Sequence, residues 1–122
     1  MSQFFNQAPG TDLEFANTLK YVRPGGGYVA PFEIFSSIEV NGAGRHPFWA
    51  ALFDSCPYNP SGFISPPGYP PTSWTPLRVC DVAWNFEKVL IGRDGKPAAR
   101  YDSGAMAEDM EGEIQRLLAA KR

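Results

Sequence analysis

The run DVAWNFEKVLIGRDGKP, residues 81–97, decides the fold predicted for this chain. Apolar side chains alternate along its first half, at Val82, Trp84 and Phe86, and a fully apolar triplet follows at residues 89–91. This pattern predicts a buried strand over residues 79–91. Asp94-Gly95 is a strong hairpin signal, so residues 96–101 should return antiparallel to that strand.

The same run carries the first candidate site residues, Trp84 and Asn85. Their indole and carboxamide groups are neutral N–H donors placed side by side. Such a pair suits a site that steadies a soft anion, such as a thiolate or selenolate, without a full positive charge. The functional reading of Trp84 rests on this neighbour, whereas Trp49 and Trp74 are interpreted as packing residues.

Three helices are predicted outside this run. Thr11 and Glu14 form a capping-box pattern that opens a helix over residues 11–21, which the Arg23-Pro24-Gly25-Gly26-Gly27 turn ends. His46-Pro47 starts a second helix that runs to about Ser55. An apolar stripe marks the last helix, at Met106, Met110, Ile114, Leu117 and Leu118, with Lys121 and Arg122 at its end.

The remaining segments are a short strand and a long loop. Residues 38–40 alternate as a strand does, before the turn at Asn41-Gly42. Residues 57–76 are too rich in proline for regular structure. The order is therefore helix, strand, helix, loop, β-hairpin, helix, an α/β fold with helices packed on a small mixed sheet. Because three strands leave an exposed edge, we interpret the chain as the C-terminal part of a larger three-layer sandwich.

Composition bounds the function classes. The 122 residues contain 43% hydrophobic residues, enough for one packed domain, and carry a formal charge of −2. This charge gives no basic surface for nucleic acid, and no apolar run approaches the roughly 18 residues of a membrane span. The two cysteines, Cys56 and Cys80, form no metal motif, and a single histidine completes no zinc site. Two thiols fit either a cytoplasmic or an extracellular location.

Four segments together resemble the glutathione peroxidase family, which has a thioredoxin-like fold: LKYVRPGGG (19–27), EVNGAGRHPF (39–48), DVAWNFEKVLIGRDGKP (81–97) and RY (100–101). The resemblance covers nearly the whole chain, residues 1–122, and it implies reduction of hydrogen peroxide and organic hydroperoxides with glutathione as co-substrate. No metal or other cofactor is implied. The PGGG turn (24–27) and the long loop before the WNF run (84–86) resemble those of tetrameric members, which implies that the full-length protein is a homotetramer.

The resemblance also implies roles for individual residues. In the family a Gln, a Trp and an Asn surround a selenocysteine or cysteine, and Gln3, Trp84 and Asn85 match these positions. Arg23 and Arg100 match positions that offer cations to the glutathione carboxylates, although Ala99 stands where many members have a second arginine. The helix over residues 11–21 lacks the resolving cysteine of thioredoxin-dependent members, which favours glutathione as reductant.

The family's selenocysteine or cysteine lies upstream of the residue matched by Gln3. We hypothesise that a UGA selenocysteine codon was read as a stop, so that the sequence was started at Met1, two residues before Gln3. On this hypothesis the 122-residue chain is inactive, and Cys56 and Cys80 are structural thiols. Genomic sequence upstream of Met1 tests it.

A second reading treats the chain as a non-catalytic interaction module. Pro66-Pro67-Gly68-Tyr69 fits the PPxY pattern that WW domains bind, and PxxP spacings in the same loop fit SH3 domains. Such short motifs arise often by chance. Loss of WW-domain binding on Tyr69→Ala would favour this second reading.

Overall fold

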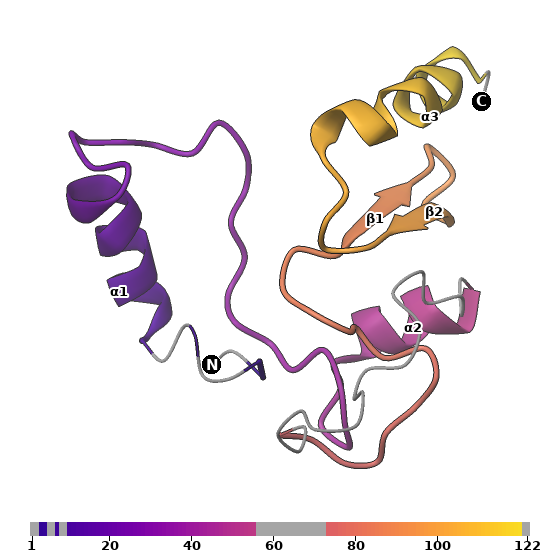
Figure 1. The fold of residues 1–122 in the computed structure, drawn as a ribbon, viewed down its shortest axis with the longest axis horizontal. Coiled ribbons are helices and arrows are strands. Elements are labelled where there is room, and N and C mark those ends of the chain that lie inside the picture. The colour runs from indigo at the N-terminus through magenta and orange to yellow at the C-terminus, as the bar shows by residue number, and fades with distance from the viewer. Residues whose placement is uncertain (1–2, 5–6, 8–9, 56–72, 121–122) are drawn as a thin grey trace.

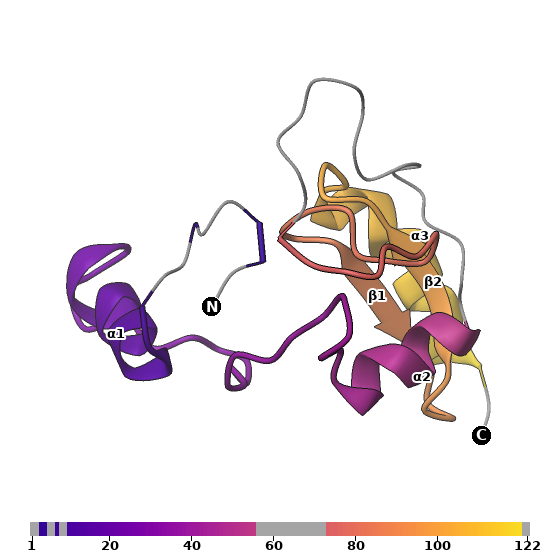
Figure 2. The same cartoon turned by 90° about the horizontal axis from the view of Figure 1, so that it is seen from below.

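A β-hairpin lies between two of the helices, on the right in Figure 1. The computed structural model describes residues 3–4, 7, 10–55 and 73–120. Its elements are α1 (Asp12–Asn17), η1 (Thr18–Val22), α2 (Pro47–Ser55), β1 (Lys88–Ile91), β2 (Pro97–Tyr101) and α3 (Ala107–Ala119). Helix α2 lies on one side of the hairpin and α3 on the other, in both views (Figures 1 and 2). The α/β fold class predicted from the sequence is confirmed.

The hairpin forms as predicted around Asp94-Gly95. Strands β1 and β2 pair antiparallel, from Lys88 opposite Tyr101 to Ile91 opposite Pro97, with an irregularity after Leu90. Gly95 takes a φ of 78°, and the Gly92 N–H donates to the carbonyl of Lys96 at 2.8 Å. A positive φ at the turn is the reason why glycine serves here.

The predicted strand over residues 79–91 is wrong in its first two thirds, because only Lys88–Ile91 is a strand. Residues 84–87 form a turn in which Phe86 has a φ of 63°, a left-handed conformation that interrupts an extended chain. The Ala83 N–H donates to the carboxylate of Glu87 at 2.5 Å, where a strand would use a neighbouring backbone. A side-chain acceptor therefore replaces the backbone hydrogen bonds between strands that the alternating pattern predicts.

The predicted strand over residues 38–40 is also wrong. This segment is extended but pairs with no strand among the described residues, whose one sheet contains only β1 and β2. The Val40 N–H instead donates to the Gln3 side chain at 2.9 Å. The sheet of the described residues is thus two-stranded and antiparallel, not a mixed sheet of three strands.

Helix α1 begins with the predicted capping box. The Glu14 N–H donates to the Thr11 hydroxyl at 3.3 Å, and the Thr11 N–H donates to the Glu14 carboxylate at 2.6 Å. The backbone bond and the hydroxyl bond from Thr11 lower the pKa of Glu14. The helix continues as a wider turn, η1, where the Arg23 N–H reaches the Thr18 carbonyl at 2.8 Å. Positive φ values at Gly25, Gly26 and Gly27 then form the predicted turn.

The apolar side of this first helix is not covered. Leu13 is 71% exposed and Phe15 47% exposed, and α1 lies apart from the helices and strands of the hairpin region (Figure 2). The extended segment after the turn also exposes Phe32 and Phe35. These large apolar side chains are therefore left in contact with solvent.

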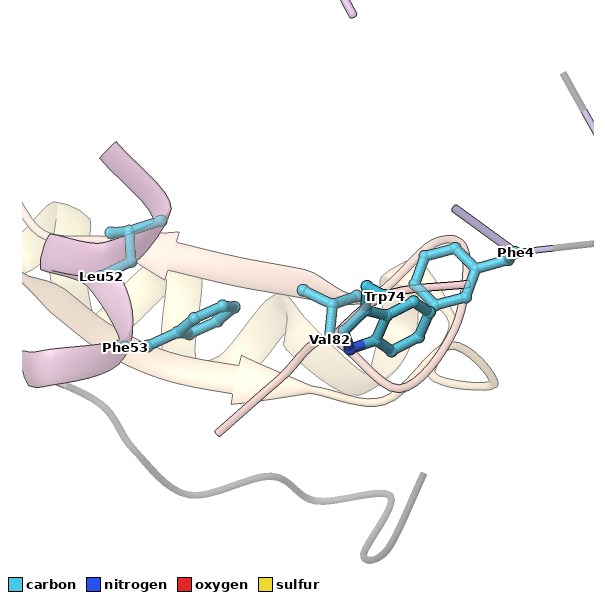
Figure 3. Packing of buried hydrophobic residues seen from close by; sticks show 5 residues of the cluster. All are labelled: Phe4, Leu52, Phe53, Trp74 and Val82. Carbon is cyan, nitrogen blue, oxygen red and sulfur yellow. The ribbon is translucent and has the colours of Figure 1, made fainter. Parts of the chain in front are cut away.

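The core extends from α2 and includes residues from distant parts of the chain. Its buried apolar members are Phe4, Leu52, Phe53, Trp74 and Val82 (Figure 3). The Phe4 and Trp74 rings meet edge to face, with centroids 5.3 Å apart. Helix α2 starts at Pro47 as predicted, and the His46 Nδ1 accepts from the Phe48 N–H at 3.2 Å. His46 is therefore a helix-start residue, as its sequence context indicates.

The last helix forms, but its apolar stripe is only partly covered. Met110 and Leu117 are half-buried, whereas Met106 and Leu118 are 66% and 61% exposed. Lys121 and Arg122, predicted to balance the helix dipole, lie outside the described residues. None of the described helices is long and apolar enough to cross a membrane.

Gly42 is the position where an added methyl group is expected to do most harm. Its φ is +81°, and a Cβ would lie 2.9 Å from the Trp74 Cβ. We expect Gly42→Ala to lower the free energy of unfolding by about 2–4 kcal/mol, from backbone strain and overpacking together. The matched control is Gly26→Ala, whose φ is +63° with no atom within 4 Å of the added Cβ. Equal losses for the two variants in urea unfolding would contradict the packing part of this argument.

Candidate active site

The carboxamide of Gln3 is held by the backbone of the extended segment before α2. Its Oε1 accepts from the N–H groups of Val40 and Asn41, both at 2.9 Å. Its Nε2 donates to the Asn41 carbonyl at 3.1 Å. These three bonds fix the plane of the carboxamide and leave its second N–H hydrogen in a defined direction.

Trp84 lies beside Phe4, the residue that follows Gln3. It is half-buried at the margin of the core, and its ring centroid is 5.8 Å from that of Phe4, at an interplanar angle of 46°. The N-terminal segment and the WNF run, about eighty positions apart in sequence, therefore pack against each other. The Trp84 indole is not sealed in the interior.

Asn85 is linked to the same N-terminal segment. Its Nδ2 donates to the Oε1 of Gln7 at 2.5 Å. Phe86, which follows it, is 83% exposed in its left-handed conformation. Strained non-glycine backbone of this kind is found disproportionately at functional sites. Gln7 carries no signal in the sequence that predicts this contact.

Asn41 connects these two parts of the site, a role that the sequence did not suggest. Its side chain is fully buried and pairs with the backbone of Val82 twice. Nδ2 donates to the Val82 carbonyl at 2.9 Å, and Oδ1 accepts from the Val82 N–H at 2.9 Å. The sequence predicts only a turn at Asn41-Gly42, which does form. The signal available in the sequence was the position of Asn41 inside EVNGAGRHPF (39–48), a segment that resembles the family.

The two arginines predicted to contact glutathione lie in different environments. Arg23 is exposed at the start of the glycine turn. Arg100 is buried and forms an ion pair with Glu87 at 2.6 Å, while its guanidinium also donates to the carbonyls of Cys80 and Asp81. Its guanidinium carbon lies 4.7 Å from the centroid of the Phe53 ring. Protein groups thus engage Arg100, and the roles of both arginines toward glutathione stay predictions.

A second buried ion pair supports the loop before the site. Asp81, fully buried, accepts from Arg45 at 2.5 Å, from the Trp74 indole at 2.9 Å and from the Arg78 N–H at 3.0 Å. Trp74 is buried and Trp49 half-buried, in keeping with their predicted packing roles. The carboxylates near Trp84, those of Asp81 and Glu87, are both paired with arginine.

Cys80 is a half-buried free thiol whose sulfur lies 3.8 Å from an Arg45 nitrogen. This position fits the predicted structural role. Cys56, most of the proline-rich loop and the PPxY motif at residues 66–69 lie outside the described residues. The interaction-module reading therefore stays untested.

Neighbouring residues connect the segments that carry the three predicted donor residues. Gln3, Trp84 and Asn85 are joined by the Phe4–Trp84 contact, the Gln7–Asn85 bond and the pairing of Asn41 with Val82. With helices on either side of a small sheet, the described residues have the architecture of an α/β protein.

Comparison with known proteins identifies the family. A glutathione peroxidase family model matches residues 1–53. Glutathione peroxidase 2 of Homo sapiens is 43% identical over 120 residues, which cover 96% of this chain and 62% of the relative. Glutathione peroxidase 1 of Mus musculus is 40% identical over 121 residues, covering 97% and 59%. A solved structure described as "Crystal structure of Trgpx in apo form" matches with a TM-score of 0.53 and 25% identity, over 97% of this chain and 74% of that one.

This chain belongs to the glutathione peroxidase family. It spans about three fifths of the length of the curated relatives it matches, since the covered shares are 62% and 59%. The predicted family and fold are confirmed.

Proposed function

We propose that this chain carries the hydrogen-bond-donor part of a peroxidase site that reduces hydrogen peroxide and organic hydroperoxides with glutathione. The observation that supports it most is that the segments carrying Gln3 and the Trp84-Asn85 pair, distant in sequence, contact each other through Phe4 and Gln7. The curated relatives, named glutathione peroxidases 1 and 2, support the same reaction.

The donors suit the first step of peroxide reduction. A deprotonated chalcogen attacks one peroxide oxygen, the O–O bond breaks, and the other oxygen leaves as water or alcohol after gaining a proton. Neutral N–H groups that are already oriented stabilise the anion without being reorganised, which is where preorganised donors contribute most. Two glutathione thiols then return the oxidised chalcogen to its resting state and form a disulfide.

The peroxidatic residue is proposed to be a selenocysteine or cysteine that these 122 residues do not contain. Arg23 and Arg100 are proposed to contact the carboxylates of glutathione, with Arg100 also stabilising the fold. The protein that contains this chain is proposed to be a homotetramer, on the basis of its PGGG turn.

The test supplies the peroxidatic residue. A chimera places ahead of Met1 those residues of human glutathione peroxidase 2 that precede the matched region, with cysteine at the peroxidatic position. We expect the 122-residue chain to show no glutathione-dependent peroxidase turnover and the chimera to show it. Trp84→Phe in the chimera should lower the rate constant for peroxide about ten- to hundredfold, because it removes one oriented donor.

Trp49→Phe is the matched control, since it makes the same chemical change at a half-buried indole of α2. This variant should keep the rate constant of the chimera within about twofold. An inactive but folded chimera, or equal losses for the two variants, would argue against the proposed function.

A further inference from the structure

We propose that Asn41 is a positioning residue that fixes Gln3 relative to the Trp84-Asn85 pair. The inference rests on the proposed function, because it explains how that site keeps its donors in place. Asn41 forms hydrogen bonds to both segments: to Gln3 in the N-terminal segment and to Val82 in the segment that leads into Trp84.

The side chain of Asn41 holds the segment that leads into Trp84. Its carboxamide donates to the Val82 carbonyl and accepts from the Val82 N–H, both at 2.9 Å. This is the pairing that a neighbouring strand would offer, made here by one side chain. Val82 lies two residues before Trp84. The two hydrogen bonds from Asn41 therefore fix the point at which the chain leaves the core and enters the WNF run.

The backbone of the same residue holds Gln3. The Asn41 N–H donates to the Gln3 Oε1, and its carbonyl accepts from the Gln3 Nε2. One residue therefore binds Gln3 through its main chain and Val82 through its side chain. A displacement of Asn41 moves Gln3 relative to Trp84, and misplacement by about 1 Å can cost about a hundredfold in rate.

Only a carboxamide of this length serves both bonds. The side chain is 0% exposed, so each of its polar atoms must find a partner inside the protein. Aspartate keeps the acceptor for the Val82 N–H but presents a carboxylate oxygen to the Val82 carbonyl. Alanine leaves both Val82 groups without the side chain that satisfies them.

The first test uses the 122-residue chain and needs no variant. NMR should detect scalar couplings across the hydrogen bonds from the Val82 N–H to the Asn41 side-chain carbonyl carbon, and from the Asn41 N–H to the Gln3 side-chain carbonyl carbon. Absence of both couplings from a folded chain would overturn the inference.

The second test uses Asn41→Asp and Asn41→Ala, with Asn17→Ala as the matched control on exposed surface. In the chain, the Asn41 variants should shift the Gln3 side-chain N–H₂ and Trp84 indole N–H resonances, whereas Asn17→Ala should leave them in place. Unmoved resonances in a folded Asn41 variant would overturn the inference.

The third test uses the peroxidase chimera and separates positioning from stability. Asn41→Ala should lower the rate constant for peroxide about tenfold or more, with the KM for glutathione unchanged. In a Gln3→Ala background the same change should cost less than about threefold, because coupled residues are not additive. Full additivity would overturn the inference. If the unsubstituted chimera is inactive, the proposed function fails, while the NMR couplings still decide whether Asn41 positions Gln3.

Discussion

Replacing Asp81 with asparagine is expected to lower the free energy of unfolding by about 3–5 kcal/mol, the cost of breaking one side of a buried ion pair. The carboxylate is fully buried and accepts from Arg45 on one oxygen and from the Trp74 indole and the Arg78 N–H on the other. Asparagine has a single acceptor oxygen, so its N–H₂ group must face a donor on one side. The Arg45 side chain, 8% exposed, also loses its counter-charge.

The loss at Arg45 should be smaller than the loss at Asp81. Without the Arg45 guanidinium, the Asp81 carboxylate keeps the Trp74 and Arg78 donors. Arg45→Met, which retains apolar volume beside Phe53, is therefore expected to cost about 1–3 kcal/mol. The double variant should lose less than the sum of the two single losses, because the two residues contact each other.

Urea unfolding followed by tryptophan fluorescence measures these losses. Asp54→Asn on α2 is the control, since Asp54 is exposed and makes the same loss of charge. It should change the free energy of unfolding by less than about 0.5 kcal/mol. A loss below about 1 kcal/mol at Asp81 would show that the buried ion pair does not support the loop before the site.

The elements that local chemistry specifies were predictable from the sequence. The capping box of Thr11 and Glu14 needs only residues three positions apart, and Asp94-Gly95 needs only the φ values that a tight turn imposes. The start of α2 at Pro47 is of the same kind. These features depend on neighbours along the chain, so tertiary contacts did not override them.

The wrong strands share a physical cause. Alternation of Val82, Trp84 and Phe86 reports which side chains are apolar, but it does not report which partner accepts the backbone hydrogen bonds. In the structure those partners are side chains: Asn41 for Val82, Glu87 for Ala83 and Gln3 for Val40. Asn41 and Gln3 are distant in sequence from the groups they bind, whereas Glu87 is close to Ala83. The periodicity of the apolar residues predicts none of these three partners.

The residues of the candidate site also divide into those that the local sequence predicts and those whose role depends on tertiary contacts. The Trp84-Asn85 pair was visible because its chemistry lies in two adjacent residues. Gln3 was found through the resemblance, and its carboxamide bonds depend on a segment 37 and 38 positions away. Asn41 was missed because its role exists only when those segments meet. Arg100 was predicted as a ligand contact, yet its burial beside Glu87 depends on how the hairpin returns to the WNF turn.

Replacing Arg100 with methionine is expected to lower the free energy of unfolding by about 3–5 kcal/mol, because Glu87 would then be a buried charge without its partner. The two side chains are 1% and 4% exposed, so solvent cannot replace the lost interaction. The same change frees the carbonyls of Cys80 and Asp81, which accept from the guanidinium at 3.0 Å. Unfolding of the 122-residue chain in urea measures the loss.

Arg23→Met is the matched control and separates the two roles proposed for these arginines. Arg23 is exposed, so its loss should leave the urea midpoint of the chain unchanged and raise the KM for glutathione in the peroxidase chimera. If Arg100→Met instead keeps the urea midpoint and changes only that KM, then Arg100 serves glutathione and the Glu87 pair contributes little to the fold. A large loss of stability would mean that any glutathione contact by Arg100 depends on a guanidinium already fixed by Glu87 and the two carbonyls. Arg100→Lys should then lose most of the stability and most of the glutathione contact, because an ammonium group cannot reproduce the planar set of donors.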